Sequence, residues 1–290
     1  MSGCHGEATS NNGKGWVMTL TADDFELSKD IRLSQSLERA VAILESFTPK
    51  KELQRNKEIS DKLGMSAATT HRYIRTLAEL GWVMQRQDSE RKYQLDSRAI
   101  DLGMKALKGR ALYARARPCL EELRRTVSHT VAYAVRESDQ ILFLDRLPGF
   151  RGYARLGLNL GPGSRLPTYC TCLGKILLAD LPTEQRETIV DGLVLQEWGP
   201  NTITHKDLLI RELELIRIAD FAISDEELKA EVHSVAVPVR DDTGEVVAAV
   251  NVTTPKSMVT RLQMTEDFVP HLFATAENIS DNLKGWTDKW

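Results

Sequence analysis

Residues 65–82 read MSAATTHRYIRTLAELGW, and this stretch decides the fold of the N-terminal part of the chain. Small and hydroxyl side chains come first, basic side chains at His71, Arg72 and Arg75 follow, and the stretch closes at Trp82. The periodicity predicts a helix with an apolar face and a basic face. A basic helix in a chain of net charge −3 indicates a local surface that lies against a negatively charged partner.

Two shorter helices are predicted before this one. Residues 33–47 place a set of apolar side chains on one face, namely Leu37, Val41, Leu44 and Phe47. A second helix starts at Asn56 as N-cap, buries Ile59 and Leu63, and ends at Gly64 as a left-handed C-cap. Ser66 then caps the third helix, whose inward side chains are expected at Tyr73 or Ile74, Leu77 and Leu80. Helices joined by a tight glycine-containing turn predict a helix-turn-helix.

A hairpin follows the third helix and completes a winged helix-turn-helix. Residues 82–87 and 91–95 alternate as two strands around a turn at 88–90. Small residues at the start of the third helix allow close approach to a DNA groove, where arginine, histidine and threonine donate to bases or phosphates. The predicted DNA contacts are Ser66, Ala67, Thr69, Thr70, His71, Arg72, Tyr73, Arg75, Arg86, Arg91 and Lys92.

Charge and composition fit this interpretation. Residues 32–98 hold 13 Lys or Arg against 9 Asp or Glu, although the whole chain is slightly acidic. The chain has 42% hydrophobic and 27% charged residues, which is typical of a soluble protein, and it has no long apolar run that predicts a membrane helix. Residues 1–30 are expected to be a disordered leader. Four cysteines in 290 residues predict a reducing, cytoplasmic location rather than a disulfide framework.

The rest of the chain predicts a second domain. We expect the winged domain at 31–96, a linker helix at 97–113 with a break near Gly109, and a domain at 114–286. Pro118 is expected in the first turn of the next helix. The hairpin at 130–146 and the two strands within 233–255 alternate with helices but show no βαβ order. We therefore predict an α+β fold with a mainly antiparallel sheet.

Polar residues in this second domain mark candidate binding segments. Thr171 and Cys172 lie where a loop enters a helix, and a helix N-terminus suits a carboxylate, although the residues alone favour a plain helix cap with buried cysteines. Ser224 and Asp225 belong to an acidic run that is ordinarily solvated. Asn251 and Thr253 alternate within an apolar strand, which places both on one face, where a ligand would satisfy their hydrogen bonds.

Tyr153 and Arg155 precede a Gly-Pro-Gly turn and are further candidates to meet an aromatic ring or a carboxylate; a surface position explains them equally well.

Three segments, SQSLERAVAILESF, EISDKLGMSAATTHRYIRTLAELGWV and RKYQLDSRAIDLG, resemble the IclR family of bacterial transcriptional regulators, and the resemblance covers roughly residues 30–285. It implies a GAF-like effector-binding domain and a homodimer or homotetramer. It also implies a pocket lined by the segment Cys172-Leu173-Gly174-Lys175, by the acidic segment with Ser224 and Asp225, and by Ser234, Asn251 and Thr253. Ser224, Glu231 and Ser234 depart from the common family pattern, and these departures bear on the identity of the effector. The segment GSRLPTYCT-x-LGK is similar to the sequences of the family branch that regulates aromatic-acid catabolism.

The sequence hypothesis is thus a transcriptional regulator that binds a palindromic double-stranded DNA operator and responds to a small carboxylate. We expect no catalytic residue, no metal site and no cofactor. The main rival is a redox sensor that uses Cys170 and Cys172. An enzyme with one of these cysteines as nucleophile and His205 or His233 as base is a weaker alternative, because no spacing pairs a histidine with either thiol.

Overall fold

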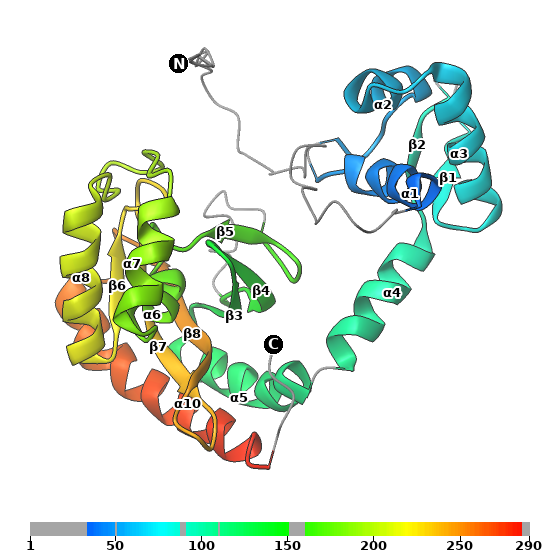
Figure 1. Ribbon diagram of the computed structural model, residues 1–290. Coiled ribbons are helices and arrows are strands. Elements are labelled where there is room, and N and C mark those ends of the chain that lie inside the picture. The colour runs from blue at the N-terminus through cyan, green and yellow to red at the C-terminus, as the bar shows by residue number, and fades with distance from the viewer. Residues whose placement is uncertain (1–33, 50, 88–90, 110, 151–159, 286–290) are drawn as a thin grey trace, which may run out of the picture. The chain divides into compact units, whose positions relative to one another are not determined.

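The computed structural model describes residues 34–49, 51–87, 91–109, 111–150 and 160–285, and the chain divides into two compact units, Met1–Lys105 and Ala106–Trp290 (Figure 1). The expected leader at 1–30, the turn at 88–90 and the strand around Tyr153 and Arg155 lie outside the described residues. Each unit has its own apolar core. None of the helices in the described ranges is long and apolar enough to span a membrane.

The first unit is built from helices α1 (Gln35–Ser46), α2 (Asn56–Leu63) and α3 (Ala67–Glu79) and the antiparallel pair β1 (Val83–Gln85) and β2 (Tyr93–Leu95). Helix α4 (Ser97–Lys108) follows, and it has no buried residue. The core of this unit consists of Ile43, Phe47, Ile59, Ile74, Leu77, Val83 and Tyr93. The predicted sequence of three helices and a hairpin is confirmed.

Three expected core residues of this unit are exposed instead. Leu37 is 68% exposed, Val41 48% and Leu80 50%. Helix α1 carries two overlapping apolar stripes, and the one that packs inward runs through Ile43 and ends at Phe47. Pattern alone does not choose between two such stripes.

The turn between α2 and α3 is set by two capping interactions. Gly64 has φ 61° and ends α2 in the left-handed conformation, which glycine adopts without a steric cost. The Ser66 side chain accepts a hydrogen bond from the Thr69 backbone N–H and starts α3. Both caps are as predicted. The N-cap of α2 is Arg55 rather than Asn56, whose side chain donates to the Ala67 carbonyl across the turn.

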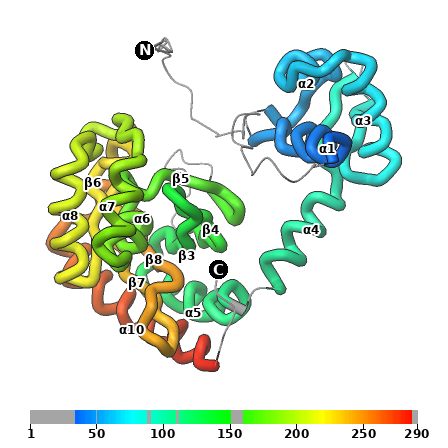
Figure 2. Tube along the Cα trace, in the orientation of Figure 1, coloured from blue at the N-terminus to red at the C-terminus, as the bar shows by residue number. Residues whose placement is uncertain are grey.

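The second unit is a six-stranded antiparallel sheet with helices on both faces (Figure 2). The strand order is β5-β4-β3-β8-β7-β6. The strands are β3 (Thr130–Glu137), β4 (Gln140–Leu147), β5 (Arg165–Pro167), β6 (Ala222–Asp225), β7 (Val232–Arg240) and β8 (Val246–Pro255). The predicted α+β class with a mainly antiparallel sheet is confirmed.

Helices of the second unit form two layers. Helices α5 (Ala111–Val127) and α10 (Val269–Asn282) cover one face, with α9 (Arg261–Gln263) and a π-helical turn at Met264–Phe268 leading into α10. Helices α6 (Cys172–Ala179), α7 (Thr183–Gly192) and α8 (Lys206–Ala219) lie on the other side of the sheet. Pro118 lies inside α5 rather than in its first turn, because the helix already starts at Ala111.

Candidate functional site

Helix α3 presents most of the predicted basic face to solvent. Ala67, His71, Arg72 and Arg75 are exposed, and Ser66 is exposed at the N-cap. The first turn of α3 carries no acidic residue, so the positive end of the helix dipole is not neutralised by a side chain of its own. This combination favours an anionic partner at the N-terminal half of α3.

Two of the predicted contacts are turned inward. Thr70 is 0% exposed and its hydroxyl donates to the Ser66 carbonyl at 3.1 Å, so the prediction of a DNA contact there is wrong. Tyr73 is half-buried against the core of the first unit, and hydrogen bonds with Ser36 and Arg39 lower the pKa of its phenol. A helix exposes only part of each turn, and these two residues lie on the side that faces α1 and α2.

The hairpin carries further basic residues beside α3. Arg86 and Arg91 are exposed and Lys92 is half-buried. The Arg86 N–H donates to the Lys92 carbonyl at 2.9 Å, which joins the two strands next to the turn. Strand β2 is also tied to the segment before α2, because Gln54 and Tyr93 exchange two backbone hydrogen bonds. The wing is therefore fixed to the helical part of the unit.

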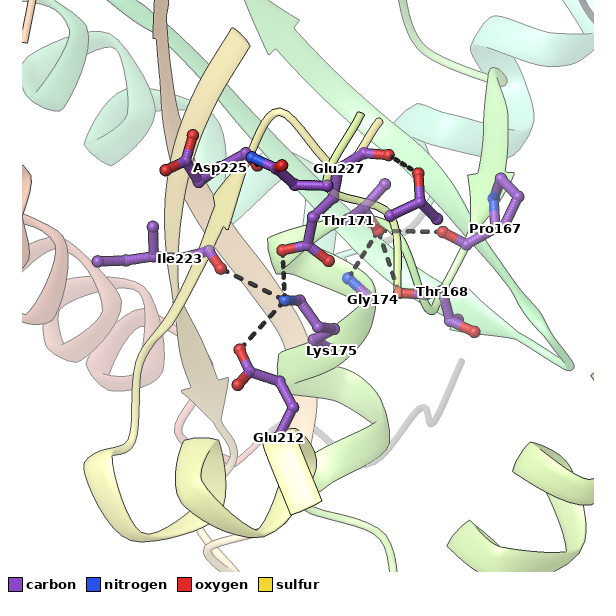
Figure 3. Close-up of polar contacts among 11 residues, drawn as sticks. Pro167, Thr168, Thr171, Gly174, Lys175, Glu212, Ile223, Asp225 and Glu227 are labelled. Atoms are coloured by element: carbon purple, nitrogen blue, oxygen red, sulfur yellow. Dashed lines mark hydrogen bonds and ion pairs between the residues drawn. The ribbon is translucent and has the colours of Figure 1, made fainter. Parts of the chain in front are cut away.

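In the second unit, the N-terminus of α6 is packed tightly against the loop that precedes it (Figure 3). The Thr171 hydroxyl accepts from the Gly174 N–H at 3.1 Å and donates to the Pro167 carbonyl at 3.1 Å. A Cβ on Gly174 would lie 2.3 Å from the Thr168 Cα, so only glycine fits there. Thr171 thus serves as a helix cap, and its hydroxyl is already engaged.

A buried ion pair lies one turn further along α6, and the sequence analysis did not predict it. Lys175 is 0% exposed, and its Nζ contacts Glu227 Oε1 at 2.6 Å and Glu212 Oε1 at 3.3 Å (Figure 3). It also donates to the Ile223 carbonyl at 3.4 Å. The other oxygen of Glu227 is buried with no partner among the described residues. Burial raises the pKa of Glu227, and the nearby Lys175 only partly offsets this.

Five of the predicted effector residues come together where α6 packs on the sheet: four lie on strands β6, β7 and β8, and Cys172 is the first residue of α6. We call this set the polar row: Cys172, Ser224, Ser234, Asn251 and Thr253. The Asn251 amide donates to Thr253 Oγ1 at 3.1 Å and to Cys172 Sγ at 3.6 Å. Ser234 lies opposite Thr253 on one side and opposite Ser224 on the other, and cross-strand partners share a face. Asn251 is also fixed by the Ala132 N–H, which donates to its Oδ1 at 3.1 Å.

Two other predicted effector residues are not in the polar row. Asp225 pairs in register with His233, and alternation along β6 turns it to the opposite face from Ser224. Its carboxylate contacts His233 Nε2 at 2.5 Å and Lys256 Nζ at 3.1 Å. Burial alone would raise the pKa of Asp225, but the hydrogen bonds and charges of Lys256 and His233 outweigh it and lower the pKa. Leu173 is 1% exposed within the apolar cluster under α6 and α8.

The cysteines of the rival redox hypothesis are deeply buried. Cys170 is 0% exposed and Cys172 1%. Burial raises the pKa of both thiols, which disfavours the thiolate that oxidants attack. In the described ranges, no group of three or more His, Cys, Asp or Glu is placed to hold a metal ion.

Comparison with known proteins agrees with both units. Residues 36–87 match the IclR helix-turn-helix domain, and residues 104–281 match the bacterial transcriptional regulator IclR C-terminal domain. The Pca regulon regulatory protein of Pseudomonas putida is 28% identical over 250 residues, which cover 86% of this chain and 84% of that protein.

Two solved structures of IclR proteins are also similar to this chain over most of its length. The IclR structure from Thermotoga maritima superimposes with a TM-score of 0.71 at 26% identity, over 86% of this chain and 98% of that one. An IclR homolog from Microbacterium hydrocarbonoxydans, complexed with 4-hydroxybenzoate, has a TM-score of 0.73 at 27% identity and covers 86% and 98%.

Proposed function

Because the chain belongs to the IclR family of transcriptional regulators, in which a DNA-binding helix-turn-helix precedes an effector-binding domain, we propose that α3 reads an operator under the control of a small carboxylate. The family and the relatives are transcriptional regulators rather than enzymes. The observation that carries the proposal is the exposed face of α3, which presents Arg72 and Arg75 on a helix whose first turn holds no acidic residue.

The proposed DNA-contacting set combines exposed side chains with Thr69 and Lys92, which are half-buried. On α3 it comprises the capping residue and the outward side chains, and on the hairpin the basic residues: Ser66, Ala67, Thr69, His71, Arg72, Arg75, Arg86, Arg91 and Lys92. Arginine donates bidentately to guanine edges or phosphates, and the small residues at the start of α3 leave room for the backbone. A dimer that reads a palindrome would place two such helices about 34 Å apart.

The effector proposal rests on the polar row. Cys172, Ser224 and Asn251 are buried and Ser234 and Thr253 are half-buried, in a domain that matches the IclR C-terminal family model. Buried polar groups that converge in one place suit the orientation of a small polar ligand. The similarity to the 4-hydroxybenzoate complex and to the Pca regulon regulator favours an aromatic carboxylate that controls a catabolic operon. Effector binding at the row needs to supply only about 1–3 kcal/mol of coupling to change DNA affinity appreciably.

The test starts by selecting duplexes from a random pool with the full-length protein and measuring affinity for the recovered sequence by fluorescence anisotropy. Arg72→Ala and Arg75→Ala should each weaken binding by roughly 5- to 150-fold if they contact bases, or reduce the salt slope by about 1 if they contact phosphates. Arg125→Ala, an equally exposed arginine on α5, is the matched control and should bind as wild type.

A second arm adds small carboxylates, aromatic and aliphatic, to the wild-type complex. Release or tightening by one of them supports effector control. Full affinity in both α3 variants would show that this helix does not read DNA.

A further inference from the structure

A half-buried arginine lies on the same sheet face as the polar row, two strands away. Arg146 on β4 pairs with Ala132 on β3, and Ala132 pairs with Asn251 on β8. Because direct cross-strand partners point to the same side of a sheet, Arg146, Ala132 and Asn251 form one line across three strands. This is the side on which Cys172 of α6 contacts Asn251.

Arg146 differs from the other cations near the row because no described residue forms an ion pair with it. Within the described ranges its guanidinium makes one long hydrogen bond, to the Leu160 carbonyl at 3.4 Å. By contrast, Lys175 and Lys256 are each held by two carboxylates. Burial lowers the pKa of Arg146, which means that desolvation of its charge is not offset by an acid. A cation in this situation favours an anionic ligand.

The neighbouring sequence offers no acid for this role either. The segment 151–159 follows β4 and reads RGYARLGLN, which contains neither Asp nor Glu. The nearest carboxylate along the strand, Asp145, is engaged elsewhere: its Oδ2 contacts Arg117 at 2.6 Å, on the α5 side. Among the residues that the structure describes, Arg146 is therefore a cation without a carboxylate partner.

The separation between Arg146 and Asn251 defines the size of ligand that fits. Adjacent strands lie about 4.8 Å apart, so the backbones of these two residues are about 10 Å apart. The residue between them is Ala132, whose small side chain is 2% exposed. A molecule that spans from Arg146 to Asn251 would have a carboxylate at one end, a narrow body over Ala132 and a hydrogen-bonding group at the other end.

We propose that Arg146 binds the carboxylate of such an elongated monocarboxylate, and that its far end lies at Asn251 and Thr253. This inference rests on the proposed function, in which the second unit responds to a small carboxylate. The planar guanidinium of Arg146 pairs with a carboxylate in a bidentate manner, which a neutral amide does not reproduce. Arg146 thereby selects acids over their amides, and the distance to the polar row selects longer acids over short ones.

The experiment is isothermal titration calorimetry of the full-length protein with three probes: 4-hydroxybenzoate, its neutral analogue 4-hydroxybenzamide, and pyruvate. Wild type should prefer the aromatic acid to both others. Arg146→Gln should weaken 4-hydroxybenzoate by about 10- to 150-fold, the range expected for hydrogen bonds to a charged group, and leave the amide within threefold. Arg146→Lys, which keeps the charge without the bidentate geometry, should fall between the two and guards against a simple folding defect.

Arg136→Gln is the matched control. Arg136 lies on the same strand face as Ala132 and is also half-buried, but it donates to the Ser138 carbonyl of its own turn at 2.9 Å and pairs with the apolar Ile141. This variant should bind 4-hydroxybenzoate as wild type does.

Three results would overturn the inference. If Arg146→Gln binds 4-hydroxybenzoate within threefold of wild type, Arg146 is not the anchor, and the proposed effector control still stands. If wild type binds pyruvate more tightly than the aromatic acid, the length argument is wrong, and effector control again stands. If wild type binds none of the probes and no other carboxylate, the effector part of the proposed function fails as well.

Discussion

Replacing Lys175 with methionine should destabilise the second unit strongly at neutral pH and much less in mild acid. The variant keeps a side chain of similar length but leaves the Glu227 carboxylate buried without its cation. Removing one partner of a buried ion pair costs about 3–5 kcal/mol. Glu227 limits this loss, because it can take up a proton instead of remaining charged.

The free energy needed to protonate Glu227 sets the upper limit of the stability that the Lys175→Met variant loses. From the ordinary pKa of 4.5, protonating Glu227 costs about 3.4 kcal/mol at pH 7 and about 0.7 kcal/mol at pH 5, at 1.36 kcal/mol per pH unit. For a domain of this size, the loss at pH 7 corresponds to a fall in Tm of about 7–14 °C. The pKa of Glu227 is already raised in the folded state, so its stabilising contribution is greatest below 4.5 and is lost as pH rises through the folded value. Removing Lys175 raises the pKa of Glu227 further, so that the free energy of unfolding falls more steeply between pH 5 and 7.

Differential scanning calorimetry of the full-length wild type and the Lys175→Met variant at pH 5 and pH 7 measures the fall in Tm. The double variant Lys175→Met/Glu227→Gln removes both charges and should recover most of the lost stability, with little dependence on pH in this window. Lys284→Met, which breaks an exposed i,i+3 pair with Asp281, is the control and should change the free energy of unfolding by under about 0.5 kcal/mol. A Tm for Lys175→Met within about 2 °C of wild type at pH 7, or an equal loss at both pH values, would refute the reasoning.

Three shorter predictions concern other parts of the two units. Gly174→Ala should lower the free energy of unfolding by about 1–3 kcal/mol, since its Cβ would meet Thr168, and urea titration should show no loss for Gly192→Ala, where a Cβ meets nothing. Thr70→Val should cost about 0.5–1.5 kcal/mol in thermal unfolding yet leave DNA affinity unchanged; weaker binding by a folded variant would mean that this buried hydroxyl reaches DNA after all. Asp225→Asn should make the free energy of unfolding depend less on pH in acid. The lowered pKa of this carboxyl stabilises the fold above pH 3.8, and the effect is lost as pH falls through the folded pKa. An unchanged pH dependence of the free energy of unfolding between pH 2 and 5 would contradict this.

Local signals made the first unit largely predictable from sequence. Gly64 and Ser66 fix the turn through backbone conformation and capping, which depend only on neighbouring residues. The choice between the two apolar stripes of α1 depends on what packs against it, so Leu37 and Val41 were wrongly placed. Thr70 was misplaced for a related reason: a threonine suits either a DNA contact or a buried position bonded to the preceding turn.

The polar row and the ion pair of Lys175 with Glu227 were predictable from the sequence only in part. Alternation correctly placed Asn251 and Thr253 on one face, and the family resemblance added Ser234 beside them. Asp225 lies on the opposite face from Ser224 because Ala222–Asp225 is a strand in which neighbours alternate, and the acidic run does not reveal this strand in the sequence. Lys175 and Glu227 lie 52 residues apart, and no local pattern predicts a pairing at that separation.

The position of β8 in the sheet has a consequence for the order in which the chain folds during synthesis. β8 lies between β3 and β7, and the bond from Ala132 to Asn251 joins residues 119 apart. At 5–20 residues per second, the ribosome needs roughly 6–24 s to deliver this partner after β3 has been made. During that interval the β3–β4 hairpin has an open, apolar edge, while the first unit, with its short-range contacts, is already complete. Chains shortened before Val246 should therefore keep the first unit folded and expose a sheet edge prone to aggregation.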